Sequence, residues 1–349
     1  MDFLLYGANG YTGALIARAA EEQGLRPLLA GRSRERVEPI ARSLGLECRI
    51  FDLSDTGAVQ DALQDLPLVL HAAGPFIHTA RPMMEACLQT RTHYLDITGE
   101  IEVFEMAHQL DDRARRAGVM LLPGTGFDVV PTDCLALFLK KRLPDATHLK
   151  LAFTALGGGV SHGTALTMVE NLGAPGAVRR NGLIVEVPVG HKTMEVAFPG
   201  KKRFVMTIPW GDVSTAYYTT GIPNIETYTG ISPSAYKFVR WQRYLGWLLR
   251  STFVKNLVKR QIEQRPPGPD EEQRRQNRSL VWGEARNAAG QRRCARLSGP
   301  EGYTLTVHAS LLITRKVLDG QAAPGFQTPA GAFGEDLIME VGGVKREEC

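Results

Sequence analysis

Short apolar runs alternate with helical stretches through the first third of the chain. The runs predict strands at residues 3–6, 27–30, 48–51, 68–72, 94–97 and 119–122. Apolar positions at helical spacing predict helices over residues 12–23, 34–44, 58–66, 80–90 and 103–117. Strands separated by helices of this size predict βαβ units with right-handed crossovers around a buried parallel sheet. The pattern therefore predicts an α/β fold for residues 1–132, a Rossmann domain with a doubly wound parallel sheet.

Beyond residue 132 the pattern changes. Strand-like runs follow with few helices between them, at residues 149–155, 183–187, 204–208 and 225–228. This is typical of a mixed, largely antiparallel sheet, so residues 133–319 are predicted to form a second, α+β domain. The remaining patterns predict a long helix over residues 235–263, an exposed loop over residues 266–277 and a last helix over residues 303–318.

A glycine-rich turn follows the first predicted strand and opens the first predicted helix. Its spacing is G-x-x-G-x-x-G rather than the commoner G-x-G-x-x-G, and it is contained in residues 7–13. Glycines allow a tight turn and a close approach of the backbone to a pyrophosphate, while the helix N-terminus attracts its charge. A purely structural turn is the alternative, but strand, motif, helix and second strand arrive in the required order. We predict cofactor contacts from Gly7, Asn9, Gly10, Tyr11, Thr12 and Gly13.

The end of the second predicted strand indicates which dinucleotide is bound. An NAD site usually offers a carboxylate there for the ribose 2′-hydroxyl. This chain has Arg32 and Ser33 instead, with Arg36 close behind. A carboxylate would repel a 2′-phosphate, whereas arginine and hydroxyl groups bind it. The alternative is a solvated helix start. We predict NADP (NADPH) over NAD, bound by these three side chains.

Further loops follow other predicted strands, at the edge of the sheet where such ligands bind. Their residues include Ala73, Gly74, Pro75 and Phe76 after the fourth strand, Thr98 and Gly99 after the fifth, and residues 124–128 after the sixth. We expect them to frame the adenine side, the nicotinamide and the substrate respectively. Each could instead be a plain turn.

Hydride transfer needs a positioned substrate and often a proton donor or acceptor within hydrogen-bond reach. The candidates are Asp128, which we favour, Glu100 and His162, with Tyr94 and Asp96 in the same neighbourhood. Two structural alternatives stand beside them. Asp128 would order the turn before the next helix, and His162 would cap a helix start or line a polar interface.

Several other classes of chemistry have little support in the sequence. No tyrosine has a lysine four residues on, as short-chain dehydrogenases require, and no H-E-x-x-H or cysteine cluster predicts a metal. Ser161 lies in a G-x-S-x-G pattern, so a serine hydrolase using it remains an unfavoured alternative. A non-catalytic NADP sensor is another.

The net charge, the cysteines and the lengths of the apolar runs indicate the compartment of the protein and its possible partners. The net charge of +4 does not indicate nucleic-acid binding, and the five scattered cysteines are expected to be free thiols. We see no leader before the first strand and no apolar run of the roughly 20 residues that span a bilayer. We therefore expect a cytoplasmic protein.

The predicted long helix is basic and amphipathic. Residues 236–260 carry seven basic side chains and no acidic one, with aromatic and aliphatic residues at helical spacing. One interpretation is peripheral contact with an anionic membrane, which would suit a lipid-linked substrate. The other, which we favour, is a core helix or a homodimer interface with a solvated basic face.

Taken together, these motifs resemble the saccharopine dehydrogenase-like oxidoreductases, and more narrowly the branch that contains trans-acting enoyl reductases. The resemblance is carried by residues 7–13, 30–33, 74–76, 94–100 and 126–131, and it extends to residues 161–164, 327–330 and 332–334. It thus covers most of the chain.

The resemblance implies a nicotinamide cofactor, a Rossmann domain and a mixed-sheet domain for substrate binding or dimerisation. It also implies a return of the tail, residues 320–349, to the first domain. It leaves the substrate open among imine, carbonyl and enoyl compounds, small or lipid-linked. One departure is His162, where we expect an arginine before Gly163 and Thr164, so the substrate differs if that arginine binds an anionic group in relatives.

Overall fold

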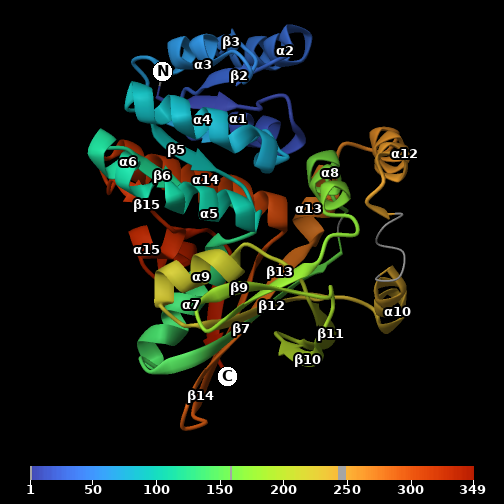
Figure 1. Ribbon diagram of the computed structural model, residues 1–349. Helices are drawn as coiled ribbons and strands as arrows, with labels where there is room; N and C mark the ends of the chain where they lie inside the picture. Colours follow the sequence, from blue (N-terminus) through green and yellow to red (C-terminus); the bar gives the residue numbers. More distant parts are fainter. Residues whose placement is uncertain (1, 158, 243–248) are drawn as a thin grey trace. The chain divides into compact units, whose positions relative to one another are not determined.

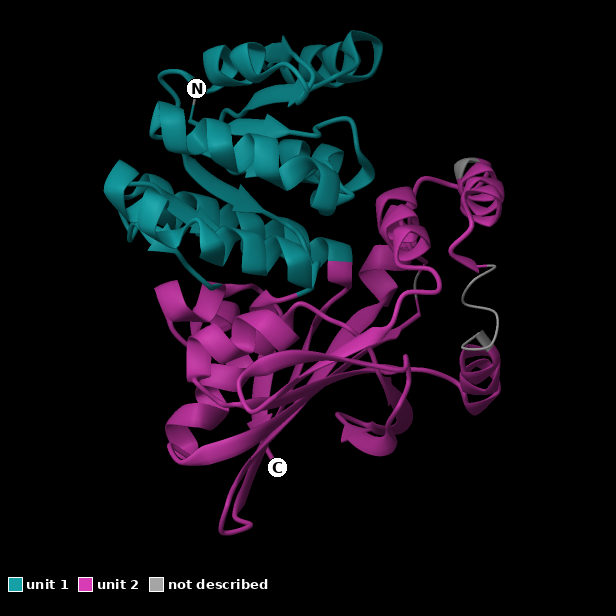
Figure 2. Cartoon of the chain, in the orientation of Figure 1, with its two compact units in different colours: residues 1–128, 303–328 teal, residues 129–302, 329–349 magenta. Residues whose placement is uncertain are grey.

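A computed structural model describes residues 2–157, 159–242 and 249–349, and it divides into two compact units. Unit 1 comprises residues 1–128 and 303–328, and unit 2 comprises residues 129–302 and 329–349 (Figure 2). This division differs from the predicted one in two segments. The helix predicted over residues 303–318 belongs to unit 1, and the tail divides, with residues 329–349 in unit 2.

Unit 1 is built around a parallel sheet with the strand order β15-β6-β5-β4-β1-β2-β3 (Figure 1). Its strands are β1 (Leu4–Tyr6), β2 (Leu28–Gly31), β3 (Cys48–Ile50), β4 (Leu68–His71), β5 (His93–Asp96), β6 (Met120–Leu122) and β15 (Gly325–Phe326). Its helices are α1 (Tyr11–Glu22), α2 (Arg34–Leu44), α3 (Thr56–Leu63), α4 (Phe76–Thr90), α5 (Ile101–Gln109), α6 (Asp111–Ala117) and α14 (Gly302–Leu318). The predicted Rossmann fold is confirmed.

The strand order reverses beside β1. Leu4, Leu5 and Tyr6 pair with β2 on one side and with β4 on the other, and every residue of β1, β2 and β4 is buried. The chain continues from β1 to β2 on one side of the switch point and from β4 to β5 on the other, so the connections after β1 and β4 lead in opposite directions. This topological switch point is where open α/β sheets bind their ligands.

Unit 2 contains a mixed sheet with the order β10-β11-β12-β7-β13-β14-β16, and β8 joins β12 to β9. The strands β12 and β7 are parallel, and the other pairs among the described strands are antiparallel, which confirms the predicted fold class. The strands are β7 (Ala146–Leu156), β8 (Gly176–Arg180), β9 (Leu183–Val187), β10 (Thr193–Phe198), β11 (Lys201–Thr207), β12 (Asn224–Gly230), β13 (Arg278–Asn287), β14 (Arg292–Pro300) and β16 (Lys345–Glu348). The helices are α7 (Val130–Arg142), α8 (His162–Glu170), α9 (Asp212–Thr220), α10 (Pro233–Gln242), α12 (Thr252–Glu263), α13 (Glu271–Gln276), α15 (Pro329–Phe333) and the 3₁₀ helix η1 (Leu337–Glu340).

Helix α7 packs closely onto this sheet because β13 has a glycine beneath it. A Cβ atom on Gly283 would lie 2.8 Å from a methyl group of Leu139 and 3.1 Å from one of Leu135. Both leucines are fully buried on α7. The missing side chain thus lets two layers of unit 2 approach one another, as interiors at close-packed density require.

Three predictions about residues 235–277 are wrong in detail. The long helix is interrupted at Ser251, whose extended backbone and hydroxyl group cap α12 through the amide of Val254. The predicted loop contains α13, which Asp270 starts with a capping box. The packed-core interpretation fails for Phe238, Trp241 and Phe253, whose exposed fractions are 68%, 70% and 78%. Residues 243–248 of the predicted helix lie outside the described residues.

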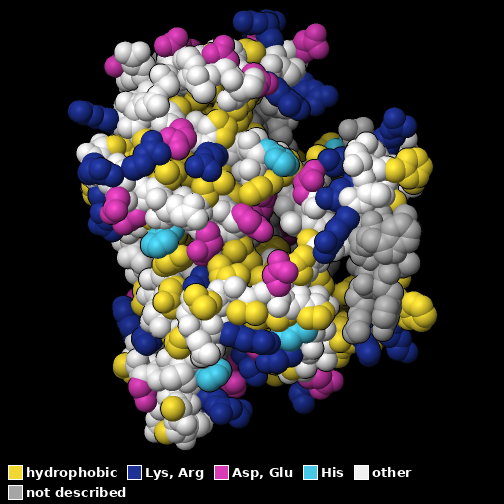
Figure 3. Space-filling view, viewed as in Figure 1, with side chains coloured by type: hydrophobic (Ala, Val, Ile, Leu, Met, Phe, Trp, Pro, Cys, Tyr) yellow, Lys and Arg dark blue, Asp and Glu magenta, His cyan; other side chains and the backbone are white. Residues whose placement is uncertain are grey.

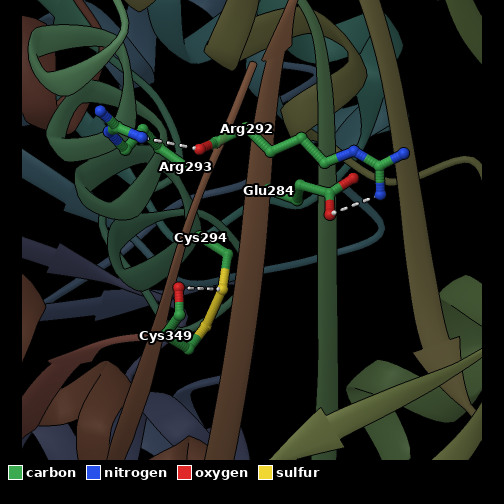
Figure 4. The surroundings of a disulfide bond; sticks show 5 residues. All are labelled: Glu284, Arg292, Arg293, Cys294 and Cys349. Atoms are coloured by element: carbon green, nitrogen blue, oxygen red, sulfur yellow. Dashed lines mark hydrogen bonds and ion pairs between the residues drawn. A yellow bond between two sulfur atoms is a disulfide. The ribbon is translucent and has the colours of Figure 1, made fainter. Parts of the chain in front are cut away.

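The expectation of five free thiols is also wrong, because Cys294 and Cys349 form a disulfide (Figure 4). The antiparallel pairing of β14 with β16 explains it. Ala295 lies opposite Glu348, so the two cysteines come to neighbouring positions, with Cα atoms 5.3 Å apart. They are separated by 55 residues in the sequence, and only the register of the sheet brings them together.

The disulfide should stabilise unit 2 and leave unit 1 unaffected. Without reductant, Cys349→Ser is expected to lower the free energy of unfolding of unit 2 by about 2–4 kcal/mol, because the cross-link restricts the unfolded chain. Tryptophan fluorescence in urea measures this, since the tryptophans all lie within residues 129–302. In dithiothreitol the variant and the unmodified protein should unfold together, and Cys48→Ser is the control. Equal midpoints without reductant would contradict the assignment.

Candidate cofactor and active site

The glycine turn after β1 is packed against the loop after β4. Gly7 has a φ of +88°, a conformation that side chains disfavour, and a Cβ atom there would lie 2.8 Å from the backbone of Ala72 and Ala73. A Cβ atom on Gly13 would lie 2.2 Å from the carbonyl oxygen of Gly7. Both positions therefore require glycine, and the backbones of the two loops lie together at the switch point.

Helix α1 begins directly at this turn. Its N-cap is Gly10, whose amide donates to the carbonyl oxygen of Gly7 and which has no side chain to cap the first turn of the helix. The first turn also carries no acidic residue. A helix start of this kind, beside backbone that only glycine can form, fits the pyrophosphate of a dinucleotide. The predicted contacts Asn9, Tyr11 and Thr12 lie on the turn and on the first turn of α1.

Arg32 and Ser33 follow β2 at the same edge of the sheet. The Arg32 side chain is exposed, and Ser33 is the N-cap of α2 but makes no capping hydrogen bond with its hydroxyl group. Asn9 links the two loops, because its Oδ1 atom lies 2.9 Å from where a Cβ atom of Gly31 would be. Arg36 is exposed on the first turn of α2. These positions fit the 2′-phosphate of NADP.

Asp52 is a charged neighbour of Arg32 that the sequence analysis missed. It follows β3, and hydrogen bonds from the amide and hydroxyl of Ser54 lower the pKa of its carboxyl group, with a further contribution from Arg32. Only the adjacency of β2 and β3 in the sheet places these charges together. A carboxylate beside Arg32 partly balances the arginine charge that faces the cofactor site.

A buried histidine supports the loop after β4 through the hydroxyl group of Thr79. Thr79 donates a hydrogen bond to the carbonyl oxygen of Ala73, and its hydroxyl lies 3.0 Å from Nε2 of His71. His71 is fully buried among Tyr6, Phe76 and Tyr94, and this burial lowers its pKa to about 3. The ring is therefore neutral and serves to position the loop of Ala73, Gly74 and Pro75.

Glu100 is tied to the start of α4. Its two carboxylate oxygens accept hydrogen bonds from the amides of Phe76 and Ile77, at 2.9 and 2.7 Å. Burial raises the pKa of this carboxyl group, and the two amides oppose the rise. Glu100 therefore caps a helix from a position 24 residues later in the chain. It also explains why α4 begins four residues before the predicted helix at residue 80.

Asp96 joins strand β5 to the loops after β5 and β6. Its carboxylate accepts hydrogen bonds from the Tyr94 hydroxyl and from the amides of Thr98 and Gly124. The side chain is fully buried, and burial raises its pKa to about 7 despite these donors. Because these partners lie on both loops, Asp96 orders the backbone that leads to Gly99 and Asp128.

Asp128 lies beside Gly99 at this edge of the sheet. A Cβ atom on Gly99 would be 2.9 Å from Oδ2 of Asp128, so the two loops touch. The Asp128 side chain is half-buried, and burial, with a contribution from the charge of Glu100, raises its pKa to about 7. Thr306 of α14 accepts a hydrogen bond from the amide of Phe127 and thereby fixes the loop. A carboxyl group that titrates near neutrality suits general acid–base chemistry.

His162 and Ser161 belong to unit 2 and are held by local contacts. The His162 ring places Nε2 2.7 Å from the carbonyl oxygen of Arg265. Ser161 is buried and caps α8 by accepting a hydrogen bond from the amide of Thr164. Asp128, Glu100 and the residues predicted to contact the cofactor thus all lie in unit 1, whereas His162 lies in unit 2.

Within residues 2–157, 159–242 and 249–349, no group of three or more His, Cys, Asp or Glu side chains is arranged to hold a metal ion. No helix in the part of the chain that the structure describes is long and apolar enough to cross a membrane.

Residues 3–122 match a family model described as the saccharopine dehydrogenase NADP binding domain. The chain is 25% identical over 204 residues to a saccharopine dehydrogenase-like oxidoreductase of Rattus norvegicus, covering 51% of this chain and 48% of the relative. It is 32% identical over 150 residues to a trans-acting enoyl reductase of Mycobacterium leprae (strain TN), covering 41% and 36% respectively. A lipid droplet localized protein of Caenorhabditis elegans is 22% identical over 405 aligned residues, covering 97% and 95%. The chain spans about half or less of the length of the first curated relatives it matches.

Solved structures share the fold at low sequence identity. Saccharopine dehydrogenase (L-Glu forming) from Saccharomyces cerevisiae has a TM-score of 0.72 at 14% identity, with 100% of this chain and 99% of that chain covered. The homospermidine synthase from Legionella pneumophila, solved with NAD, has a TM-score of 0.65 at 11% identity, with 100% and 91% covered. The solved structures confirm the predicted fold, while the family model and the curated relatives confirm the predicted resemblance and the NADP-binding class of residues 3–122.

The raised pKa of Asp128 makes a prediction about stability. Burial disfavours the ionised form of Asp128 in the folded state. The protein is therefore less stable when this carboxyl group loses its proton, as the pH rises toward and through about 7. Asp128→Asn should therefore stabilise unit 1 by about 1–2 kcal/mol at about pH 8 and by less at about pH 5. Hydrogen exchange in β5 and β6 measures this.

Asp61, exposed on α3, supplies the matched control. Asp61→Asn should leave the exchange-derived free energy unchanged at both pH values. A stabilisation by Asp128→Asn that does not grow with pH would show that burial does not raise the pKa of Asp128.

Proposed function

We propose that the protein is an NADP-dependent oxidoreductase, because residues 3–122 match the family model of the saccharopine dehydrogenase NADP binding domain. It transfers a hydride to or from a carbon of an imine, carbonyl or enoyl substrate. The observation that carries the proposal is the glycine turn packed on Ala72 and Ala73 at the switch point, with Arg32 at the end of the next strand.

Different residues of unit 1 contact different parts of the cofactor. The turn of residues 7–13 and the start of α1 hold the pyrophosphate, and Arg32, Ser33 and Arg36 hold the 2′-phosphate. Ala73, Gly74, Pro75 and Phe76 line the adenine side, with Thr98 and Gly99 toward the nicotinamide. When bound, NADPH supplies a hydride to the electrophilic carbon of the substrate.

Asp128 moves the accompanying proton. Its raised pKa of about 7 keeps a substantial protonated fraction near neutral pH, so its carboxyl group donates a proton during reduction and accepts one during oxidation. Glu100 acts as a positioning residue, because both of its oxygens hold the start of α4. His162 stands where the resemblance implies an arginine, so the substrate differs from that of relatives if their arginine binds an anionic group.

The activities and locations named for relatives suggest which substrate class this protein reduces. One is a trans-acting enoyl reductase and another is a lipid droplet localized protein. Both suit an enoyl or carbonyl group on a lipid-linked substrate, while saccharopine dehydrogenase suits an imine. The protein is proposed to work in the cytoplasm as a homodimer, with Cys48, Cys87 and Cys134 as free thiols there.

Two other functions make different predictions. A non-catalytic NADP sensor would bind NADPH tightly without turning over any substrate. A serine hydrolase would be labelled by a fluorophosphonate in a reaction that Ser161→Ala abolishes, but the Ser161 hydroxyl group is buried and caps α8.

The test is NADPH consumption with a panel of cyclic imines, ketones, aldehydes and enoyl thioesters. At least one class should be reduced, with a kcat/KM that falls as the pH rises above about 7 because Asp128 loses its proton. Asp128→Asn should lower kcat by about 10²–10⁴-fold and remove this pH dependence, whereas Asp61→Asn should do neither. NADPH binding without turnover in every class would favour the sensor.

A further inference from the structure

Helices α10 and α12 present large apolar side chains to solvent. Phe238 and Trp241 on α10 are 68% and 70% exposed, and Phe253 on α12 is 78% exposed. They are among the most exposed large hydrophobic side chains of the described residues. Both helices lie on the same side of unit 2 in Figure 1. Exposure of several aromatic side chains on one side of a protein marks an interaction surface.

The opposite sides of both helices are fixed to unit 2. The Tyr236 hydroxyl donates to the carbonyl oxygen of Gly190, and its ring packs on Phe204. On α12, Lys255 and Lys259 donate to the backbone and side chain of Glu170 on α8. These contacts orient the helices, so the exposed aromatic side chains stand on the remaining face and not on a loosely attached segment.

Basic side chains accompany the exposed aromatic ones. Lys237 and Arg240 are exposed on α10, next to Phe238 and Trp241, and Arg260 is exposed on α12. Figure 3 shows yellow hydrophobic and dark blue basic atoms next to one another over both helices. No acidic residue occurs between residues 231 and 262. We call these five side chains, together with Phe253, the aromatic-basic surface.

We propose that the aromatic-basic surface docks the protein on an anionic phospholipid surface. Aromatic side chains partition into the boundary between lipid headgroups and acyl chains, and lysine and arginine are attracted to anionic headgroups. The surface carries one sign of charge, so pairing it with the same surface of a second copy would bring like charges together. The combination of bulky apolar groups with unopposed positive charge therefore fits a lipid surface better than a second subunit.

Sedimentation of the full chain with lipid vesicles tests the proposal. The protein should bind phosphatidylcholine vesicles that contain phosphatidylserine, and bind vesicles of phosphatidylcholine alone about tenfold or more weakly. Raised salt should weaken the binding to the anionic vesicles. Equal binding to both vesicles, or none to the anionic vesicles at low salt, would overturn the proposal.

Matched variants distinguish binding through this surface from non-specific adsorption to vesicles. The double variant Phe238→Ser/Phe253→Ser should weaken vesicle binding by about tenfold or more. Leu183→Ser is the control, because Leu183 on β9 is also apolar and 71% exposed but lies outside the surface. For the charges, Lys237→Gln/Arg240→Gln should weaken binding, whereas Lys201→Gln/Lys202→Gln, on exposed lysines of β11, should not.

The same samples show whether the variants remain folded and whether a second copy of the chain occupies the surface. Thermal melting followed by circular dichroism should be unchanged in the serine variants, since exposed side chains contribute little to stability. Equal losses of binding in the Leu183 control would overturn the proposal. So would light scattering that shows a dimer dissociated by Phe238→Ser/Phe253→Ser, which would assign the surface to a second copy. These readouts need no cofactor or substrate, so they stand apart from the proposed activity.

Discussion

The contact between two backbones at the switch point is the constraint on which unit 1 depends. Gly7 lies against Ala72 and Ala73, and Gly13 lies against Gly7, at distances that leave no room for a Cβ atom at either glycine. Parallel pairing of β1 with β2 and β4 brings these loops to one edge, and the glycines let them close on each other. A helix start without a side-chain cap then faces that edge. The backbone of these loops and of the start of α1 thus forms a site that fits a pyrophosphate, independently of the side chains around it.

Around this contact, buried polar groups have distinct tasks. Asp96 and Glu100 accept backbone amides and organise the loops after β4, β5 and β6. His71, neutral because it is buried, supports the loop of Ala73 through Thr79. The pKa values of Asp96 and Asp128 are both raised to about 7, but Asp96 is fully buried whereas Asp128 lies half-buried beside Gly99. Asp96 and Glu100 therefore order the backbone, whereas the exposed part of Asp128 leaves this carboxyl group accessible for proton transfer.

Local signals in the sequence were sufficient for the Rossmann strands, the glycine turn and the start of α2. The signals are short-range ones, apolar runs and glycines within a few residues of each other. The sequence pattern did not reveal contacts between distant positions. These include the capping of α4 by Glu100, the pairing of Cys294 with Cys349, and the packing of Thr306 beside Gly126. The interruption at Ser251 was missed because apolar spacing continues across it, while the capping hydroxyl decides the local backbone.

The central claim is that the glycine turn and Arg32 bind NADP in preference to NAD. Titration of the full chain with NADPH and with NADH, followed by nicotinamide fluorescence, tests it most directly. NADPH should bind more tightly, and Arg32→Ala should weaken NADPH by about 10–100-fold through loss of a charge-assisted contact, with little effect on NADH. Equal affinity for the two dinucleotides, or binding of neither, would contradict the account.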